Sequence, residues 1–527
     1  MSIKMKAWPL LVIAATELVS GASAQEPALP PGLSGGKAQS TEPSLPPGLD
    51  EEPGLPSGLG GEPGLPPGLG GEPGLPSGLG GSSEPGLPPG LEKEEPSLPM
   101  GLGGDADPLD GAPHGPGGLL SFAEGHGIKG FLDLRAGTRT QRDPYSRTAS
   151  IAEARLRLEA ERQVGSVFLR GSTDLVVDPL FDSWAPDLET GQGFIDLREA
   201  YGSFSPASWL DVKAGRQVLT WGTGDLPFIN DLFPKDWVAF FTGREMEYLK
   251  APSDAVRAGI FTDVANIDLV YTPRFDADRF IRGDRVSFYN PLLGRPSGRD
   301  APVQTDAPDE WFNDSEYSAR IYRNAGGTEL AAYGYLGYWK SPAGFDAASG
   351  RARFPRLAVY GASARTQLAG GIASAEVGYY DSREDQGGDD PFVDNSEARI
   401  LVGFERDLPE VAHSLTLGVQ YYLEEMMQYS EYKRTLPNGV PMREESRHSV
   451  IIRVNKLLLE QRLTLSLYTY TSPTDGDTFL KPTATYAVDD SWSVTIGGNA
   501  FAGSDDRTFL NQFGPNTNVY AALRFSF

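Results

Sequence analysis

The chain ends with VYAALRFSF, residues 519–527. In an extended strand, successive side chains point to opposite faces, so the odd-numbered residues from Val519 to Phe527 form one apolar face. The even-numbered residues, among them Tyr520 and Arg524, form the other face. In water such a strand would leave an exposed edge that pairs with other chains. It becomes stable when the apolar face meets lipid, the other face meets a polar lumen, and the edge pairs with the first strand to close a barrel.

The terminal pattern also resembles the signature by which bacterial outer-membrane proteins are recognised for insertion. Phe527 is preceded by apolar residues at every second position, among them Leu523 and Phe525. The resemblance implies that these three residues form an assembly signal for the barrel-assembly machinery. The alternative is an ordinary antiparallel strand that ends a soluble β domain.

Alternating segments separated by Gly, Asp, Asn and Pro recur throughout residues 128–527. In the clearest, residues 152–162, Ala and Leu alternate with Glu and Arg. Residue propensity alone favours a helix here. However, charges at every second position would surround a helix, whereas a strand places them all on one face. We therefore expect a strand whose charged face lines water.

The pattern predicts an all-β fold, a transmembrane antiparallel β-barrel of about 18 strands. A count of 14 or 16 would follow if neighbouring segments formed a hairpin within a loop. Long polar stretches such as 274–315 and 425–445 are expected to be external loops, and tyrosine and tryptophan pairs near segment ends are expected to form interfacial girdles. The expected strands are 128–139, 150–162, 165–176, 194–204, 209–221, 254–263, 265–273, 316–325, 328–340, 355–368, 371–381, 396–406, 412–424, 446–457, 461–472, 478–488, 491–502 and 517–527.

The amino-terminus has the pattern of a secretory signal peptide, residues 1–24. Lys4 and Lys6 precede the apolar stretch 7–15, and the small residues 22–24 form a cleavage site. Export is therefore expected.

Residues 26–102 repeat the unit E-P-G/S-L-P-P/S-G-L seven times. Proline removes backbone donors and glycine raises the entropy cost of ordering, so we expect residues 25–127 to form a disordered periplasmic extension. One interpretation is a passive acidic linker. The other is docking of a periplasmic protein through the repeated Leu-Pro contacts of residues 26–102.

The composition argues against several classes of protein. The chain has no cysteine, so it cannot build a disulfide, a c-type haem attachment or an iron–sulfur site. The net charge of -25, from 46 basic and 71 acidic residues, argues against a nucleic-acid partner. No run of about 18 apolar residues follows the amino-terminus, which excludes spanning helices.

The sequence also gives little basis for catalysis. Of the four histidines, His413 and His448 lie in expected strands and each directly precedes a serine, so each pair points to opposite faces. We expect no enzyme activity and no cofactor. The acidic stretches 385–390 and 475–477 offer oxygen ligands suited to Ca²⁺, but they match no defined loop motif, and we interpret them as solvated turns rather than as metal sites.

The segment most suggestive of function lies within residues 211–244. Strict alternation from Leu210 would place Arg216 in lipid, and a bulge at Gly215 would turn Arg216 inward and Leu219 and Trp221 outward. The following residues are too apolar for an ordinary external loop. They predict either a loop that narrows the lumen or a loop packed on the barrel rim. The expected constriction residues are Asp225, Phe228, Asp231, Phe233, Lys235, Asp236 and Trp237.

The motif Ala-Gly-Arg-Gln-x-x-x-Trp-Gly at 214–222 resembles the strand-and-turn motif of porin-like outer-membrane barrels of the alginate-export and related uncharacterised families. The resemblance implies a Gram-negative outer-membrane pore, without implying a particular solute. The repeat segment departs from the family pattern.

We therefore expect an outer-membrane porin, embedded in lipid, through which small polar or charged solutes diffuse passively. The alternative is a barrel that anchors or sheathes a periplasmic partner held by the Pro-rich extension. Mixed charges facing a wide lumen would create a transverse field, although they are also typical of a salt-bridged wall that only keeps the barrel open. The expected lumen-facing charges are Glu153, Arg155, Arg157, Glu159, Arg170, Asp174, Asp196, Arg198, Asp211, Lys213, Arg216 and Arg524.

Overall fold

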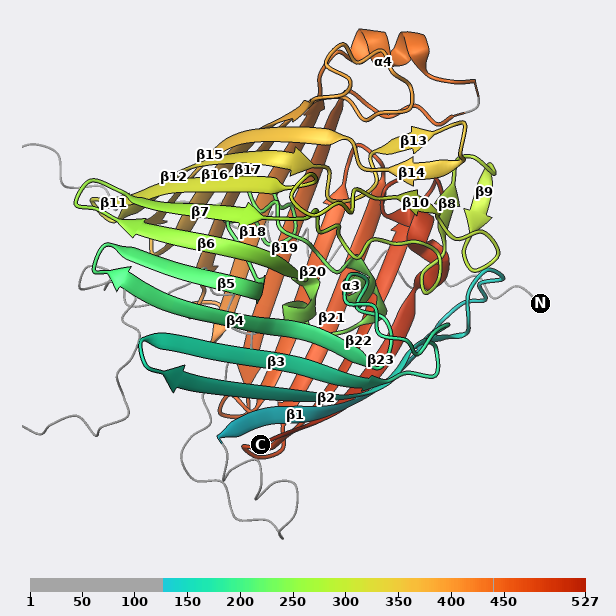
Figure 1. Ribbon diagram of the computed structural model, residues 1–527. Helices are drawn as coiled ribbons and strands as arrows, with labels where there is room; N and C mark the ends of the chain where they lie inside the picture. Colours follow the sequence, from blue (N-terminus) through green and yellow to red (C-terminus); the bar gives the residue numbers. More distant parts are fainter. Residues whose placement is uncertain (1–126, 439) are drawn as a thin grey trace, which may run out of the picture. The chain divides into compact units, whose positions relative to one another are not determined.

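A computed structural model describes residues 127–438 and 440–527. The expected signal peptide and the Pro-rich repeats lie outside the described residues. The described part forms one 18-stranded antiparallel sheet that closes on itself (Figure 1). Closure occurs because β1 (Ile128–Arg139) pairs with both β2 (Ala149–Val164) and β23 (Asn518–Ser526). The predicted barrel is confirmed.

Each of the expected segments coincides with one strand of this sheet, which confirms the count of 18. The remaining barrel strands are β3 (Val167–Val177), β4 (Ile195–Ala207), β5 (Leu210–Val218), β6 (Pro252–Phe261), β7 (Asn266–Thr272), β11 (Glu316–Ala325), β12 (Thr328–Tyr338), β15 (Arg356–Leu368), β16 (Gly371–Ser382), β17 (Glu397–Asp407), β18 (Leu415–Met426), β19 (Ser446–Leu458), β20 (Leu463–Ser472), β21 (Asp477–Ala487) and β22 (Trp492–Gly503).

The carboxy-terminal strand closes the barrel as its sequence predicts. Its register on β1 runs from Ser526 opposite Phe131 to Asn518 opposite Arg139. Beyond the strand, the backbone amides and carbonyls of Gly130 and Phe527 exchange two hydrogen bonds of 3.0 and 2.9 Å. The edge that would be exposed in a soluble domain is therefore fully paired.

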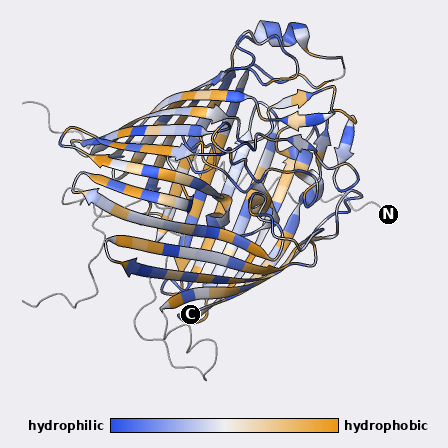
Figure 2. Ribbon diagram, viewed as in Figure 1, coloured by the Kyte–Doolittle hydropathy of each residue, from blue (hydrophilic) through white to orange (hydrophobic). Residues whose placement is uncertain are grey.

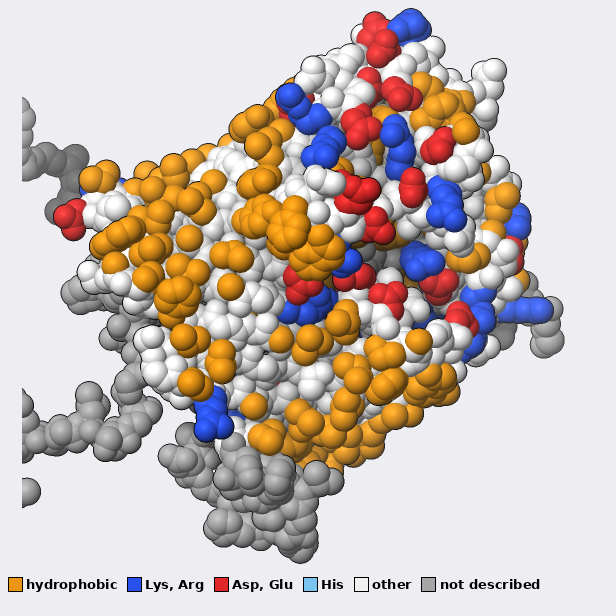
Figure 3. All heavy atoms as spheres, viewed as in Figure 1, with side chains coloured by type: hydrophobic (Ala, Val, Ile, Leu, Met, Phe, Trp, Pro, Cys, Tyr) orange, Lys and Arg blue, Asp and Glu red, His pale blue; other side chains and the backbone are white. Residues whose placement is uncertain are grey.

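Alternation separates an apolar outer face from a polar inner face. On β23, Val519 is 49% exposed on the outside, whereas Tyr520 is only 5% exposed and points inward. The strands of Figure 2 change repeatedly between hydrophobic and hydrophilic colouring, and in Figure 3 apolar side chains spread over the outer side of the strands. None of the helices in the described residues is long and apolar enough to cross a membrane. A closed sheet with an apolar outer face meets the requirements of a membrane-spanning barrel, since every strand pairs its backbone groups within the sheet.

The expected aromatic girdles are only partly present. Tyr379 and Tyr421 face outward and are exposed. The prediction is wrong for the other members, which are buried, and most of them lie on the inner side because strand alternation turns them toward the lumen. Tyr338 shares the outward face of Leu336 but is buried under Phe275 and Phe354. The inward residues are Trp339, Tyr380, Tyr422, Tyr468 and Tyr470.

The two ends of the barrel differ in their connections. At the end where β1 starts and β23 stops, most strands are joined by tight turns such as 165–166 and 326–327. At the other end lie the long connections, and Figure 3 shows charged side chains gathered there. These connections contain β8 (Phe288–Asn290), β9 (Arg295–Ser297), β10 (Thr305–Asp306), β13 (Gly344–Asp346), β14 (Arg351–Arg353), α4 (Tyr429–Thr435) and the 3-10 helix η2 (Asn511–Asn516).

Replacing Ile496 by Lys is expected to destabilise the barrel, because Ile496 faces outward from β22 and the ammonium group would enter hydrocarbon. The expected loss is about 2 kcal/mol in the free energy of unfolding, measured by denaturant titration of the protein folded in lipid vesicles. The control is Thr495→Lys at the adjacent residue, whose side chain faces the lumen and bonds to Thr485 at 3.0 Å. Equal losses at both positions would contradict the assignment of the two faces.

Candidate functional site

The connection between β5 and β6, residues 219–251, folds into the barrel, and we call it the inward segment. It contains α3 (Trp237–Thr242) and the 3-10 helix η1 (Met246–Leu249). Figure 1 draws α3 within the ring of strands. Its apolar residues, such as Ile229 and Phe240, are buried in one cluster with inward-facing residues of the barrel wall. Of the two arrangements that the sequence allowed, the structure adopts the one inside the lumen rather than packing on the rim.

Local sequence sets the ends of α3. The side chain of Asp236 accepts a hydrogen bond from the amide of Ala239 at 2.7 Å, which caps the helix start. Gly243 ends the helix in the left-handed conformation, with φ 96°. A side chain at Gly243 would also collide with the ring of Tyr520, so only glycine allows α3 to approach β23 so closely.

One wall of the barrel holds α3 through aromatic contacts. The Phe241 ring lies 5.6 Å from that of Phe479 and 5.3 Å from that of Phe501. Phe240 packs on Phe479 as well, at 5.3 Å, and the ammonium group of Lys481 lies 4.3 Å from the centre of the Phe240 ring. Because these rings interdigitate across β21 and β22, α3 is fixed against this wall.

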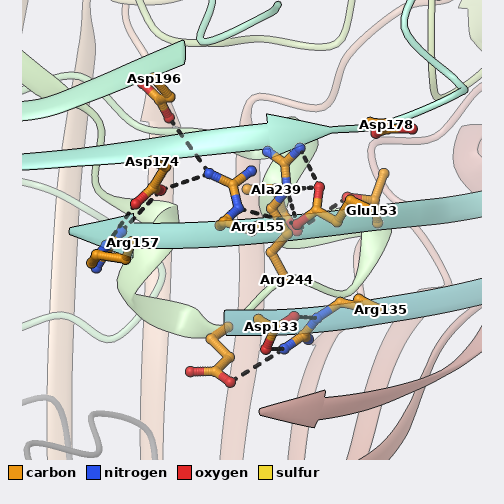
Figure 4. A network of polar contacts seen from close by, with 12 residues as sticks. Asp133, Arg135, Glu153, Arg155, Arg157, Asp174, Asp178, Asp196, Ala239 and Arg244 are labelled. Atoms are coloured by element: carbon orange, nitrogen blue, oxygen red, sulfur yellow. Dashed lines mark hydrogen bonds and ion pairs between the residues drawn. The ribbon is translucent and has the colours of Figure 1, made fainter. Parts of the chain in front are cut away.

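The wall formed by β1–β4 holds the segment through a network of ion pairs (Figure 4). Glu153 on β2 pairs with Arg155 at 3.2 Å and with Arg244 of the inward segment at 2.9 Å. Asp174 on β3 pairs with Arg155 at 2.6 Å and with Arg157 at 2.7 Å. Since these carboxylates and guanidinium groups are buried, each depends on its partners to offset the loss of hydration.

A second ionic contact joins the segment to β4 through the 273–315 connection. Arg279 lies 2.8 Å from Asp196 on β4 and 3.3 Å from Asp236 at the start of α3. Burial by itself would lower the pKa of Arg279, but the two carboxylates outweigh it and raise this pKa above its ordinary value. Arg279 therefore remains charged and bridges the wall and the segment.

Tyr248 of η1 lies among three guanidinium groups. Its ring centre is 4.6 Å from Arg155, 4.8 Å from Arg157 and 5.2 Å from Arg198. These cation–π contacts attach η1 to the same wall as the ion pairs.

The structure places most of the expected lumen charges on the inner faces of their strands, although whether they line a conducting pore stays a prediction. Glu199, which alternation alone leaves ambiguous, also points inward. The inward-facing members are Glu153, Arg155, Arg157, Glu159, Arg170, Asp174, Asp196, Arg198, Asp211, Lys213 and Arg524.

Unlike the other expected lumen charges, Arg216 does not face the lumen, because the bulge expected at Gly215 is absent. The register of β5 on β6 is unbroken, with Gly215 opposite Ala255 and Arg216 opposite Asp254. Arg216 therefore stays on the outward face, where it pairs with Asp254 at 2.9 Å and donates a hydrogen bond to the carbonyl of Leu188.

As a further consequence of this register, Leu219 and Trp221 face inward and are buried in one cluster with Phe233. The irregularity lies on the neighbouring strand instead. Ser172 pairs with Glu199 but Thr173 pairs with Leu197, so the bulge occurs at Arg198.

The expected constriction residues have different positions within the segment. Asp225 reaches the opposite wall, where its carboxylate lies 2.8 Å from Arg453 on β19. Asp231 and Lys235 pair with each other at 2.9 Å inside the segment, and Asp236 caps α3. Phe228 lies over the Lys235 ammonium group, Phe233 packs on Trp221, and Trp237 donates a hydrogen bond to Asp278 at 3.1 Å.

Sequence reasoning missed two wall residues that contact the segment, Glu376 and Arg453, and also Tyr248 within the segment. The first two are charged residues at inward positions of expected strands, so the alternation used for β2 would have identified them as inward-facing. Their contact with residues 219–251 has no local signal, because it joins parts of the chain far apart in sequence.

In the acidic stretches considered for Ca²⁺, Asp385 and Asp475 form contacts with other protein groups. Asp385 accepts a hydrogen bond from the amide of Asp389 at 3.0 Å, and Asp475 pairs with Arg447 at 2.7 Å. His413 lies in a turn rather than in a strand, and its ring contacts Ser414 at 2.7 Å, so the expectation that this pair points to opposite faces is wrong.

No protein-family model and no curated protein matches the chain. Among solved structures, OccAB3 of Acinetobacter baumannii is 10% identical, with 76% of this chain and 99% of that chain covered and a TM-score of 0.44. OccK11 (OpdR) of Pseudomonas aeruginosa is 11% identical, with 76% of this chain and 94% of that chain covered and a TM-score of 0.43. Salmonella typhi OmpF in complex with daunomycin is 10% identical, with 76% of this chain and 97% of that chain covered and a TM-score of 0.38. At these TM-scores the likeness carries no weight of its own, and the barrel is established by its strand pairing.

Replacing Glu153 by Gln should lower the free energy of unfolding by about 3 kcal/mol, because buried Arg155 and Arg244 lose their shared carboxylate. Arg244→Met should have a similar cost. The double variant should cost less than the sum by at least about 1 kcal/mol, since the two groups interact directly. Denaturant titration measures all three.

The control for this cycle is the exposed pair Arg507–Asp505, where Asp505→Asn is expected to change stability by less than about 1 kcal/mol. Strictly additive costs for Glu153 and Arg244 would contradict the network described above.

Proposed function

We propose that this chain is an outer-membrane channel through which small polar or charged solutes diffuse passively, with the inward segment as its constriction. The observation that carries the proposal is a lumen wall that remains charged and partly exposed beside a loop folded into the barrel. A barrel interior filled only by apolar packing would not keep such groups in contact with water.

The charges in question have both signs. Arg170 on β3 pairs with Glu199 at 2.6 Å, Arg257 on β6 pairs with Asp268 at 3.1 Å, and Glu405 on β17 pairs with Arg453. The side chains of Arg257 and Glu405 are 35% and 31% exposed. These pairs join nearby strands and leave charged groups of both signs along the lumen wall, which favours polar and charged solutes over apolar ones.

The inward segment is attached to walls on different sides of the lumen. Asp225 contacts Arg453 on β19, whereas Arg244 contacts Glu153 on β2. A solute that crosses the barrel must pass beside this segment. We infer that the passage is narrowest there, with Asp225 and Arg453 among the groups that contact the solute.

The orientation follows from the connections. We place the end with tight turns, where β1 starts and β23 stops, in the periplasm, so that the extension of residues 25–127 lies there as well. In this arrangement the outward apolar face contacts outer-membrane lipid, and Leu523, Phe525 and Phe527 form the assembly signal read by the barrel-assembly machinery.

The test is single-channel conductance of the refolded mature protein in planar bilayers, with the reversal potential measured under a salt gradient. Discrete conductance steps are expected. A folded, inserted barrel that remains silent would overturn the channel. That result would favour the alternative, a barrel that sheathes a periplasmic partner bound through residues 26–102.

Replacing residues 228–236 by a short Gly-Ser linker is expected to raise the single-channel conductance by about twofold or more, because the narrowest part of the passage is removed. The refolded variant is compared with the unchanged chain in the same bilayers. Unchanged conductance would contradict a constriction formed by this segment.

Ion selectivity is expected to depend on pH through Asp225. Burial raises the pKa of Asp225 above its ordinary value, although Arg453 acts in the opposite direction. As the pH falls, Asp225 therefore loses its negative charge at a higher pH than an ordinary aspartate does. The reversal potential should shift toward anion selectivity over that range, and Asp225→Asn should show the shift already at neutral pH. An Asp225→Asn channel with unaltered selectivity would contradict this assignment.

A further inference from the structure

Glu376 on β16 points into the lumen and is 1% exposed. Two residues of the inward segment, Thr223 and Asn230, donate hydrogen bonds to its carboxylate. Thr223 donates through its amide at 2.9 Å and its hydroxyl at 3.1 Å. Asn230 donates through its amide at 2.8 Å and its side-chain nitrogen at 2.9 Å. We call residues 222–230 the lobe, since Glu376 binds both of its ends.

The wall beside Glu376 is shaped to receive the lobe. Gly361 on β15 faces Asn230 so closely that a Cβ at this position would overlap its side-chain oxygen. A Cβ at Gly378 would lie 2.6 Å from the side chain of Ile229. The two glycines therefore form a shallow seat on neighbouring strands, which residues with side chains would fill.

The lobe itself has a glycine where it meets the carboxylate. Gly222 has φ 85°, which favours glycine, and a Cβ there would lie 2.8 Å from Oε1 of Glu376. The hydroxyl of Tyr380 completes the contact by donating to the carbonyl of Ile229 at 2.5 Å.

Glu376 differs from the other buried carboxylates that hold the segment. Glu153, Asp174 and Asp196 each pair with arginine. In the described part of the chain, Glu376 forms no ion pair, so the donors of the lobe are what offsets the burial of its charge. Hydrogen bonds to a charged acceptor are about twice as strong as neutral ones. A neutral side chain at this position would therefore weaken the hydrogen bonds to the lobe.

We propose that Glu376 is the positioning residue of the constriction: its carboxylate, beside the seat that Gly361 and Gly378 form for the lobe, holds the lobe against β15 and β16 and so sets the width of the passage. This inference rests on the proposed channel function. Glu376 acts through the lobe, which carries Asp225, rather than through contact with the solute. The other half of the segment, residues 237–251, is held separately by β2, β21 and β22, so loss of Glu376 releases the lobe while α3 stays in place.

The first test is the variant Glu376→Gln in planar bilayers. The amide directs two N–H groups toward the donors of the lobe, so the expected result is a mean conductance at least about 1.5-fold higher, with larger current fluctuations in the open state. Steady current at the original conductance would overturn the proposal. Glu329→Gln is the control, because it removes the same charge from a lumen-facing residue that pairs with Arg320 and not with the lobe.

A second variant reaches the same result by a different route. Gly378→Ala keeps the Glu376 charge but fills the seat, so it should also loosen the lobe and raise the conductance. Resistance of the barrel to denaturant at the original level shows that the variant is folded. A folded Gly378→Ala barrel with unchanged conductance would overturn the role of the seat.

The third measurement does not require conduction. The chain has no cysteine, so a single Ile229→Cys reports on the lobe alone. Ile229 is fully buried, and its labelling by a water-soluble maleimide should be slow. Adding Glu376→Gln should raise the labelling rate by about tenfold or more, while Glu329→Gln should leave it unchanged.

An equal labelling rate with and without Glu376→Gln would overturn the positioning role. If the unchanged protein is silent in bilayers but Glu376→Gln still accelerates labelling, the channel function fails and the positioning role stands.

Discussion

The structure depends on one constraint: within lipid, every backbone N–H and C=O group must be paired by the protein itself. An open sheet fails this requirement at its two edges, so the first and last strands must meet, as β1 and β23 do. Closure then imposes the alternation, because every strand has one face toward lipid and one toward the lumen. The modest hydrophobic content of the chain follows, since only the outer half of the strand residues needs to be apolar.

A barrel of 18 strands encloses more space than its own wall residues fill, and the inward segment occupies part of it. Four kinds of contact fix this segment: aromatic packing on β21 and β22, ion pairs on β1–β4 and β19, cation–π contacts of Tyr248, and hydrogen bonds to Glu376 on β16. The ion pairs add little net stability, because dehydrating the charges offsets much of their attraction. Their effect is geometric, since guanidinium and carboxylate groups bond in few orientations.

The strands were predictable because alternation is a local property, visible within about ten residues at 152–162 or 519–527. Details that depend on neighbouring strands were not. The bulge was expected at Gly215, but the phase is corrected at Arg198 on the adjacent strand. The tyrosines of β20 have the composition of a girdle and yet face inward, where Tyr468 packs on Phe240 of α3 and Tyr470 packs on Phe509. The contact between Glu376 and the lobe joins residues about 150 positions apart, and no periodicity reveals it.

The position of the inward segment also orders the events of folding. Residues 219–251 precede most of the strands that hold them, since β15, β16, β19, β21 and β22 all follow in the chain. Their final contacts cannot form until those later strands have assembled, and such non-local contacts carry a high loop-closure entropy. While the wall is incomplete, Phe240 and Phe241 lack their aromatic partners Phe479 and Phe501 and can form non-native contacts instead. The strands that are synthesised last therefore provide the contacts that fix a segment synthesised early.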